Sequence, residues 1–111
     1  RNKTMANDFT NAKAVGVTTQ TTVYTAPALK DSIILELDVA NTTSSAVTAS
    51  VKLYDATDSA LAHIVKDAPI PTGGALQVIS GQKVVLMSGD YLCVVASGAV
   101  DVVCSVLQDV N

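Results

Sequence analysis

The stretch from Ser32 to Tyr54 constrains the fold most, because it contains two segments in which apolar and polar side chains alternate. Successive side chains of a β-strand point to opposite faces, so this alternation predicts strands with one apolar face each. The first apolar row would consist of Ile33, Leu35, Leu37 and Val39, and the second of Val47, Ala49, Val51 and Leu53. We therefore predict two half-buried strands over residues 32–41 and 46–54.

Residues 41–45 separate these strands and are all small and polar, which suits a loop between antiparallel strands. We predict a hairpin in which Val39 pairs with Val47 and Leu37 pairs with Ala49. This register is favoured because a slip of one residue would turn an apolar row to water.

The rest of the chain repeats the pattern of short apolar segments and turns. Further strands are expected at residues 12–18, 21–26, 61–67, 76–80, 83–87, 91–96 and 100–107. Two more hairpins are expected, one turning at Gly81 and Gln82 and a terminal one turning at Gly98 and Ala99. Strands that recur every 8 to 12 residues predict an all-β fold, either a β-sandwich or a small barrel. We favour an antiparallel β-sandwich of the jelly-roll or immunoglobulin-like type with about eight or nine short strands.

The length of 111 residues suits one domain, which we place at residues 12–111 after an N-terminal arm of residues 1–11. The 49% share of apolar residues includes no run of 18, so no membrane-spanning helix is expected. Polar and charged groups occur throughout the first 15 residues in place of a continuous apolar stretch, so no secretory signal is expected either.

The net charge of −3 combines a slightly basic arm with an acidic body. Duplex DNA is bound mainly through basic contacts to phosphate, so a specific nucleic-acid partner is not expected.

Cys93 and Cys104 are the two cysteines of the chain. In the predicted terminal hairpin they would lie opposite each other, at a separation that allows a disulfide without requiring one. Reduced, buried thiols are the alternative, since no oxidising compartment is indicated.

No set of residues predicts catalysis, a cofactor or a metal site. His63 is the single histidine and has no cysteine or second histidine near it, so a zinc pattern cannot be recognised. Glu36 and Asp38 share one strand, whereas paired catalytic carboxylates face each other across a cleft. We therefore expect no enzymatic activity.

The terminal hairpin would be apolar on both faces, which indicates either the covered centre of a sheet or a surface that packs on another subunit. The arm could add a strand to a neighbour. The residues expected at a partner interface are Met5, Phe9, Tyr91, Cys93, Val95, Val103 and Leu107.

Four segments of the chain carry a family resemblance. They read MANDFTNAKAVGVTTQTTVYTAP, VANTTSSAVTASVKLYDA, AHIVKDAPIPTGGALQVISGQKVVLMSGDYL and AVDVVCSVL. Together they resemble small β-sandwich virion structural proteins of tailed bacteriophages. The resemblance implies a protein made in the host cytoplasm that binds the major capsid protein or other virion proteins at the capsid surface. It also implies a homo-oligomer, with a trimer favoured. A membrane partner is not expected, because the chain has no apolar run long enough to span a bilayer.

Three functions follow as expectations. The first is a capsid decoration or cement protein that binds the outer shell as an oligomer. The second is a structural component of the tail, neck or fibre, and the third is a carbohydrate- or receptor-binding β-module. The 4% share of aromatic residues disfavours the third, because sugar-binding surfaces commonly use aromatic rings.

Overall fold

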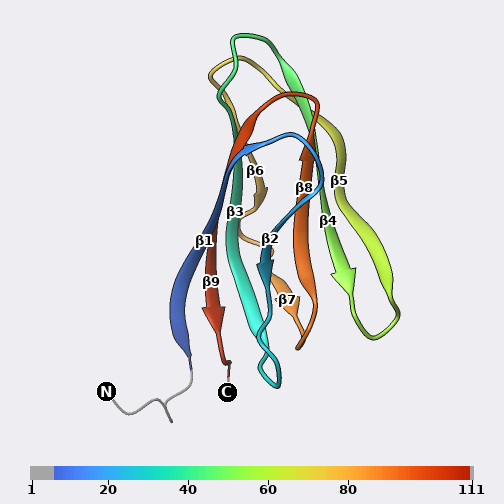
Figure 1. The fold of residues 1–111 in the computed structure, drawn as a ribbon. Helices are drawn as coiled ribbons and strands as arrows, with labels where there is room; N and C mark the ends of the chain where they lie inside the picture. The colour runs from blue at the N-terminus through green and yellow to red at the C-terminus, as the bar shows by residue number, and fades with distance from the viewer. Residues whose placement is uncertain (1–6, 111) are drawn as a thin grey trace.

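The computed structural model describes residues 7–110, which form two packed antiparallel sheets (Figure 1). The strands of these residues are β1 (Asp8–Val17), β2 (Thr21–Thr25), β3 (Ser32–Asn41), β4 (Val47–Asp55), β5 (Ala60–Ile70), β6 (Ala75–Ile79), β7 (Val84–Leu86), β8 (Tyr91–Ala96) and β9 (Val100–Gln108). This arrangement confirms the prediction of an antiparallel β-sandwich. Residues 7–110 contain no helix that could span a membrane.

The strand order identifies the type of sandwich. One sheet, called sheet A, has the order β1-β9-β3-β6, with β7 also paired to β3. The other, sheet B, has the order β2-β8-β4-β5. Chain neighbours therefore mostly lie in different sheets, and this order is that of a jelly roll, in which two Greek keys are wrapped into a double sheet. Of the two types expected, the jelly roll is the one that forms.

The core lies between the sheets and is built from the inward rows of both. Its fully buried large side chains are Ile34, Leu37, Val39, Val51, Ile70, Ile79, Leu86, Leu92, Val94, Val100, Val102 and Val106. Tyr24 links the sheets at one end, because its hydroxyl donates to Gln108 Oε1 at 2.9 Å and lies 2.8 Å from Ser32 Oγ. Burial raises the pKa of this phenol.

The predicted hairpin between β3 and β4 is wrong, because the two strands lie in different sheets. Leu37 pairs with Cys104 and Ile79, whereas Ala49 pairs with Ala96 and Ala68. The apolar side chains that do face the core lie on opposite sides of it: Leu37 and Val39 from β3, and Val47, Ala49 and Val51 from β4. Alternation reports which face of a strand is buried and carries no information about its neighbour.

The connection from β3 to β4 is a corner built around the buried Asn41 side chain. Its amide nitrogen donates to the carbonyl oxygens of Ser45 at 2.8 Å and Ile70 at 3.0 Å. Its Oδ1 accepts from the Thr43 N–H at 2.9 Å and the Thr43 hydroxyl at 2.8 Å. The polar loop therefore serves to turn the chain from one sheet to the other.

The inward row of β3 is also not the predicted one. The register with β9 shifts between Ile34 and Glu36, which is a β-bulge at Leu35. Ile34, rather than Ile33, points into the core and is fully buried, while Ile33 and Leu35 are half-buried on the outer side. Leu37 keeps its predicted inward position because it lies beyond the bulge.

The predicted hairpin at Gly81 and Gln82 does not form. β6 pairs with the second half of β3, and β7 pairs with its first half, so the two follow each other along one edge. They behave as a single edge strand interrupted by residues 80–83.

The predicted terminal hairpin is split between the sheets, with β8 in sheet B and β9 in sheet A. Cys93 pairs with Lys52 and Thr22, whereas Cys104 pairs with Leu37, so the two thiols are not opposite each other. Both are free and buried, as the reduced alternative had it. Burial raises the pKa of the Cys104 thiol to about 12.

The N-terminal strand begins earlier than predicted. β1 starts at Asp8 and pairs with β9 throughout, so residues 8–11, which were assigned to the arm, belong to the sandwich. The start of β1 and the end of β9 lie side by side (Figure 1), where the Asn7 N–H donates to the Asp109 carbonyl at 2.8 Å. Residues 1–6, which include Met5, lie outside the described residues.

Candidate protein-interaction surface

The outer face of sheet A carries an apolar row that crosses the whole sheet. Phe9 of β1 pairs with Leu107 of β9, Leu107 with Ile33 of β3, and Ile33 with Val85 of β7. These four residues, which we call the outer row, alternate with inward neighbours such as Val106 and therefore point away from the core. Phe9 is 77% exposed and Val85 57%. Ile33 and Leu107 lie between them and are half-buried, so the four side chains form a continuous apolar row, which makes this face the candidate contact surface.

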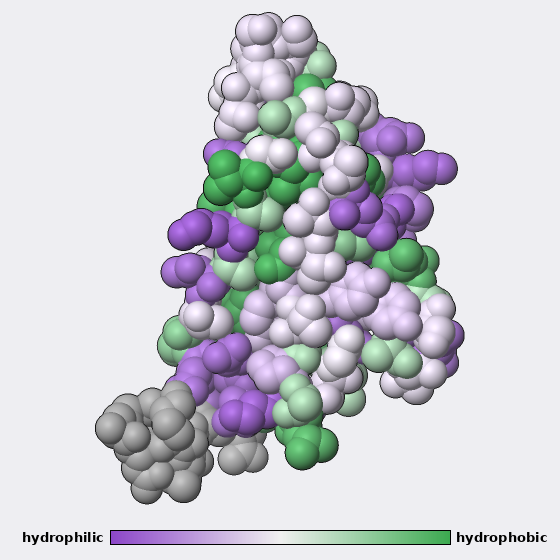
Figure 2. Space-filling view, in the orientation of Figure 1, coloured by the Kyte–Doolittle hydropathy of each residue, from purple (hydrophilic) through white to green (hydrophobic). Residues whose placement is uncertain are grey.

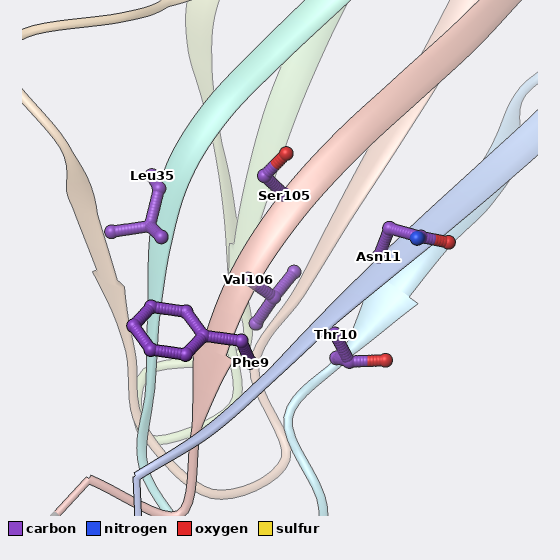
Figure 3. A pocket seen from close by; sticks show the side chains of 6 residues that line it. All are labelled: Phe9, Thr10, Asn11, Leu35, Ser105 and Val106. Carbon is purple, nitrogen blue, oxygen red and sulfur yellow. The ribbon is translucent and has the colours of Figure 1, made fainter.

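The bulge in β3 adds a hollow beside the outer row. The hollow measures about 310 Å³ and is lined by Phe9, Thr10, Asn11, Leu35, Ser105 and Val106. Figure 3 shows the Phe9 ring extending from β1 over β9 towards β3, where Leu35 lies, while Thr10 points the other way. The extra residue in β3 turns Leu35 to the outer face, and this gives the hollow its apolar wall.

Charged groups border the apolar surface further along the strands. Val103, which is 53% exposed, lies between Lys13 of β1 and Asp38 of β3. A hydrogen bond with Asp38, followed by repulsion from the same carboxylate, raises the pKa of Glu36. Asp38 Oδ1 is buried without a hydrogen-bond partner among the described residues. The apolar surface therefore ends at a cation on β1 and two acids on β3.

The residues predicted at a partner interface do not form one surface. Phe9, Val103 and Leu107 lie together on the outer face of sheet A. Tyr91 and Val95 lie on the outer face of sheet B, on the opposite side of the molecule, because β8 and β9 belong to different sheets. Met5 lies outside the described residues.

The outer face of sheet B is less apolar and more closely bonded. Tyr91 stacks on Tyr54, with ring centroids 4.7 Å apart and planes at 17°. Cys93 is only 1% exposed, so this predicted contact residue is not open to a partner. Nearby, Lys52 donates to Gln20 Oε1 at 2.9 Å, and the Ser50 hydroxyl accepts from the Asp67 N–H at 2.9 Å. These side chains are already engaged within the chain, which favours sheet A as the contact face.

Sequence reasoning missed three residues of the surface, namely Ile33, Leu35 and Val85. The first two were assigned to the core because strict alternation was assumed through β3. The sequence did contain a signal: Ile33, Ile34 and Leu35 are three consecutive apolar residues. In a strand with alternating side chains they cannot all face the core, so at least one of them must face outwards.

Figure 2 views the edge of the sandwich at β1 and β2, and shows green hydrophobic areas on the side where β1 runs, separated by polar areas.

Within residues 7–110, no group of three or more His, Cys, Asp or Glu residues is placed to hold a metal ion. His63 lies exposed on β5, opposite Lys52.

Comparisons of the chain with protein-family models, with curated proteins and with solved structures gave no match.

Proposed function

We propose that this protein is a non-enzymatic structural component of a tailed-phage virion, which decorates or cements the capsid through the outer face of sheet A. The virion assignment is supported by the sequence resemblance, which covers most of the chain. The observation that carries the contact is the outer row, where Phe9 and Val85 are 77% and 57% exposed.

Burial of this surface against a partner would supply the binding energy. Fully burying a large apolar side chain is worth about 1.5 to 3 kcal/mol, and Phe9, Val85 and Val103 are each more than half exposed. Several kcal/mol are therefore available to each copy before the cost of association. Repetition of the same contact over a shell would give the particle an added stability that a single contact lacks.

The jelly roll itself does not decide between the candidate functions. It occurs in viral capsid domains and in lectin domains, so the function has to be argued from the surface. The stacked pair of Tyr54 and Tyr91 is the feature that favours the carbohydrate alternative. Each ring, however, covers one face of the other, so less aromatic surface remains on which a sugar could stack.

The proposal is tested by quantitative mass spectrometry of purified particles from the phage that encodes the chain. Hundreds of copies in each particle are expected for a capsid decoration protein. A few dozen copies or fewer would replace this location with the tail, neck or fibre alternative. Absence from the particles would overturn the virion assignment.

A binding experiment with particles stripped of the protein tests the contact face. Phe9→Ser should reduce loading at least tenfold, because it removes the most exposed member of the outer row. Leu61→Ser is the matched control: Leu61 is 46% exposed on sheet B and should load normally. Normal loading of the Phe9 variant together with defective loading of the control would move the contact to sheet B. A Tyr91→Ser variant that alone loses binding to glycans would favour the carbohydrate alternative.

A further inference from the structure

The first part of the β1 edge of sheet A, residues 8–14, contains no proline and no register shift, two features that usually block pairing between sheet edges. Residues 8–14 run in unbroken register with β9, and the first irregularity comes between Ala14 and Val17. β5 contains Pro69 and two register shifts, β2 has five residues and one shift, and the far edge of sheet A is divided between β6 and β7. Natural edge strands are normally short, bulged or interrupted by proline, so β1 differs from the other described edges.

The backbone groups that face this open edge follow from a hydrogen bond at the start of the strand. The Asn7 N–H donates to the Asp109 carbonyl at 2.8 Å. Hydrogen-bonded and non-hydrogen-bonded pairs alternate in an antiparallel ladder, so the odd-numbered residues 9–13 turn their backbone groups to β9. The N–H and C=O groups of Thr10, Ala12 and Ala14 therefore point to the open edge.

The side chains around this edge also leave room for a neighbour. Thr10 is on the inward side of sheet A and is nevertheless exposed, so sheet B does not cover this part of β1. Phe9 and Asn11 are exposed on the outer side. Lys13 is the one cation among residues 8–14. An edge lysine opposes pairing most strongly where it meets a like charge across the edge, so the register decides its effect.

We infer that β1 pairs antiparallel with β1 of a second copy, across a two-fold axis at Asn11, and joins the two A sheets into one. In this register Thr10 lies opposite the second copy's Ala12, and Phe9 lies opposite the second copy's Lys13. Such a contact is self-complementary, as a two-fold interface requires. The pairing uses the backbone edge of β1 and, of the outer row, only Phe9, so it adds a contact between copies that the proposed function does not include.

The register is fixed by three conditions. Residues of one outward face must meet residues of the same outward face, so odd positions must pair with odd positions. The whole regular segment of residues 8–14 is used when the axis passes through its middle residue, Asn11. The two copies of Lys13 then lie apart, and each ammonium group can lie against the exposed ring of Phe9, which attracts a cation.

Sedimentation of the full chain tests the pairing. The wild-type chain should sediment as a dimer. Ala12→Pro should raise the dissociation constant of the dimer at least tenfold, so that the variant sediments as a monomer. Proline removes the Ala12 N–H, which points to the open edge, and so leaves the β1–β9 ladder intact. Ala12→Ser keeps this N–H and should remain dimeric. Far-UV circular dichroism verifies that both variants are folded.

Disulfide trapping tests the register without proline. Asn11→Cys places two thiols across the axis in a non-hydrogen-bonded pair, where the Cα atoms are about 4.5 Å apart and a disulfide can form. Lys13→Cys is the matched control, because the two copies of residue 13 are separated by four residues along the strand, about 14 Å. Mild oxidation should cross-link the Asn11 variant and leave the Lys13 variant unlinked.

Three results would overturn the pairing: a monomeric or trimeric wild-type chain, equal cross-linking of both cysteine variants, or no cross-linking of Asn11→Cys. A chain that is monomeric in solution and still loads particles would refute this pairing and leave the proposed function standing. A chain that is dimeric in solution and absent from particles would refute the proposed function and leave the β1 pairing standing.

Discussion

The β-bulge in β3 makes a prediction that separates the structure from simple alternation. Ile34 is fully buried in the core, whereas Leu35 is half-buried at the hollow on the outer face. Strict alternation from Leu37 backwards would bury Leu35 and expose Ile34. Truncation of each side chain to alanine therefore gives opposite results under the two arrangements.

The expected magnitudes follow from burial. Removing a fully buried isoleucine or leucine costs about 2 to 5 kcal/mol, because transfer energy is lost and a cavity is left. We expect Ile34→Ala to lower the free energy of unfolding by about 3 kcal/mol. Leu35→Ala should cost less than about 1 kcal/mol, as is usual for residues that face solvent. Leu37→Ala is the reference, because Leu37 is buried in both arrangements and should cost about 3 kcal/mol.

Urea unfolding followed by circular dichroism measures these differences. With a urea dependence of about 1.5 kcal/mol/M, a loss of about 3 kcal/mol moves the midpoint by roughly 2 M, well above the error of a fit. The slope should stay constant across the variants, which verifies that each unfolds in the same way. If Leu35→Ala is as damaging as Leu37→Ala and Ile34→Ala is mild, the bulge is not present and the hollow loses its apolar wall.

Three further predictions concern single side chains outside the core rows. Asn41→Ala should lower the free energy of unfolding by about 2 to 3 kcal/mol in urea titrations, since it leaves a buried carbonyl of β5 without its donor. Glu36 has a raised pKa in the folded state, so its contribution to stability is present below about pH 4.5 and is lost as the pH rises through the folded pKa. Glu36→Gln should therefore become more stable relative to wild type as the pH rises above 4.5, and urea midpoints that stay parallel over this range would contradict it. Leu29 has φ of 64° and is 97% exposed, so Leu29→Gly should be more stable than Leu29→Ala by about 1 kcal/mol in thermal melts, because only glycine adopts this conformation without strain.

The sequence was sufficient to predict features that depend on local physics. Alternation through Val47, Ala49 and Val51 correctly placed these side chains in the core. The sandwich class and most strand positions followed because Gly, Pro and short polar residues interrupt the apolar segments. The strand expected at residues 21–26 is β2, which ends at Thr25, two residues before Pro27, a residue that cannot donate to a ladder.

The pairing of strands could not be predicted by the same means. Three hairpins were expected between chain neighbours, and none of them formed. A short polar loop after an inward apolar row fits a hairpin within one sheet and an arch between two sheets equally well. In the corner at Asn41, the difference is made by a bond from the side chain to Ile70, which is 29 residues away in the chain. Such a partner cannot be identified from the loop sequence alone.

The jelly-roll order also explains why the candidate surface was only partly predicted. Because consecutive strands mostly enter different sheets, residues close in sequence are sent to opposite faces, as Tyr91 and Val103 are. The outer row instead collects one residue from each of four strands, β1, β9, β3 and β7, and two of these strands lie near opposite ends of the chain. No local motif can describe such a surface, because its members are neighbours only through the ladder. An interaction surface on a fold of this kind is therefore recognised by cross-strand register, and the open edge at β1 is where that register is free to continue into another molecule.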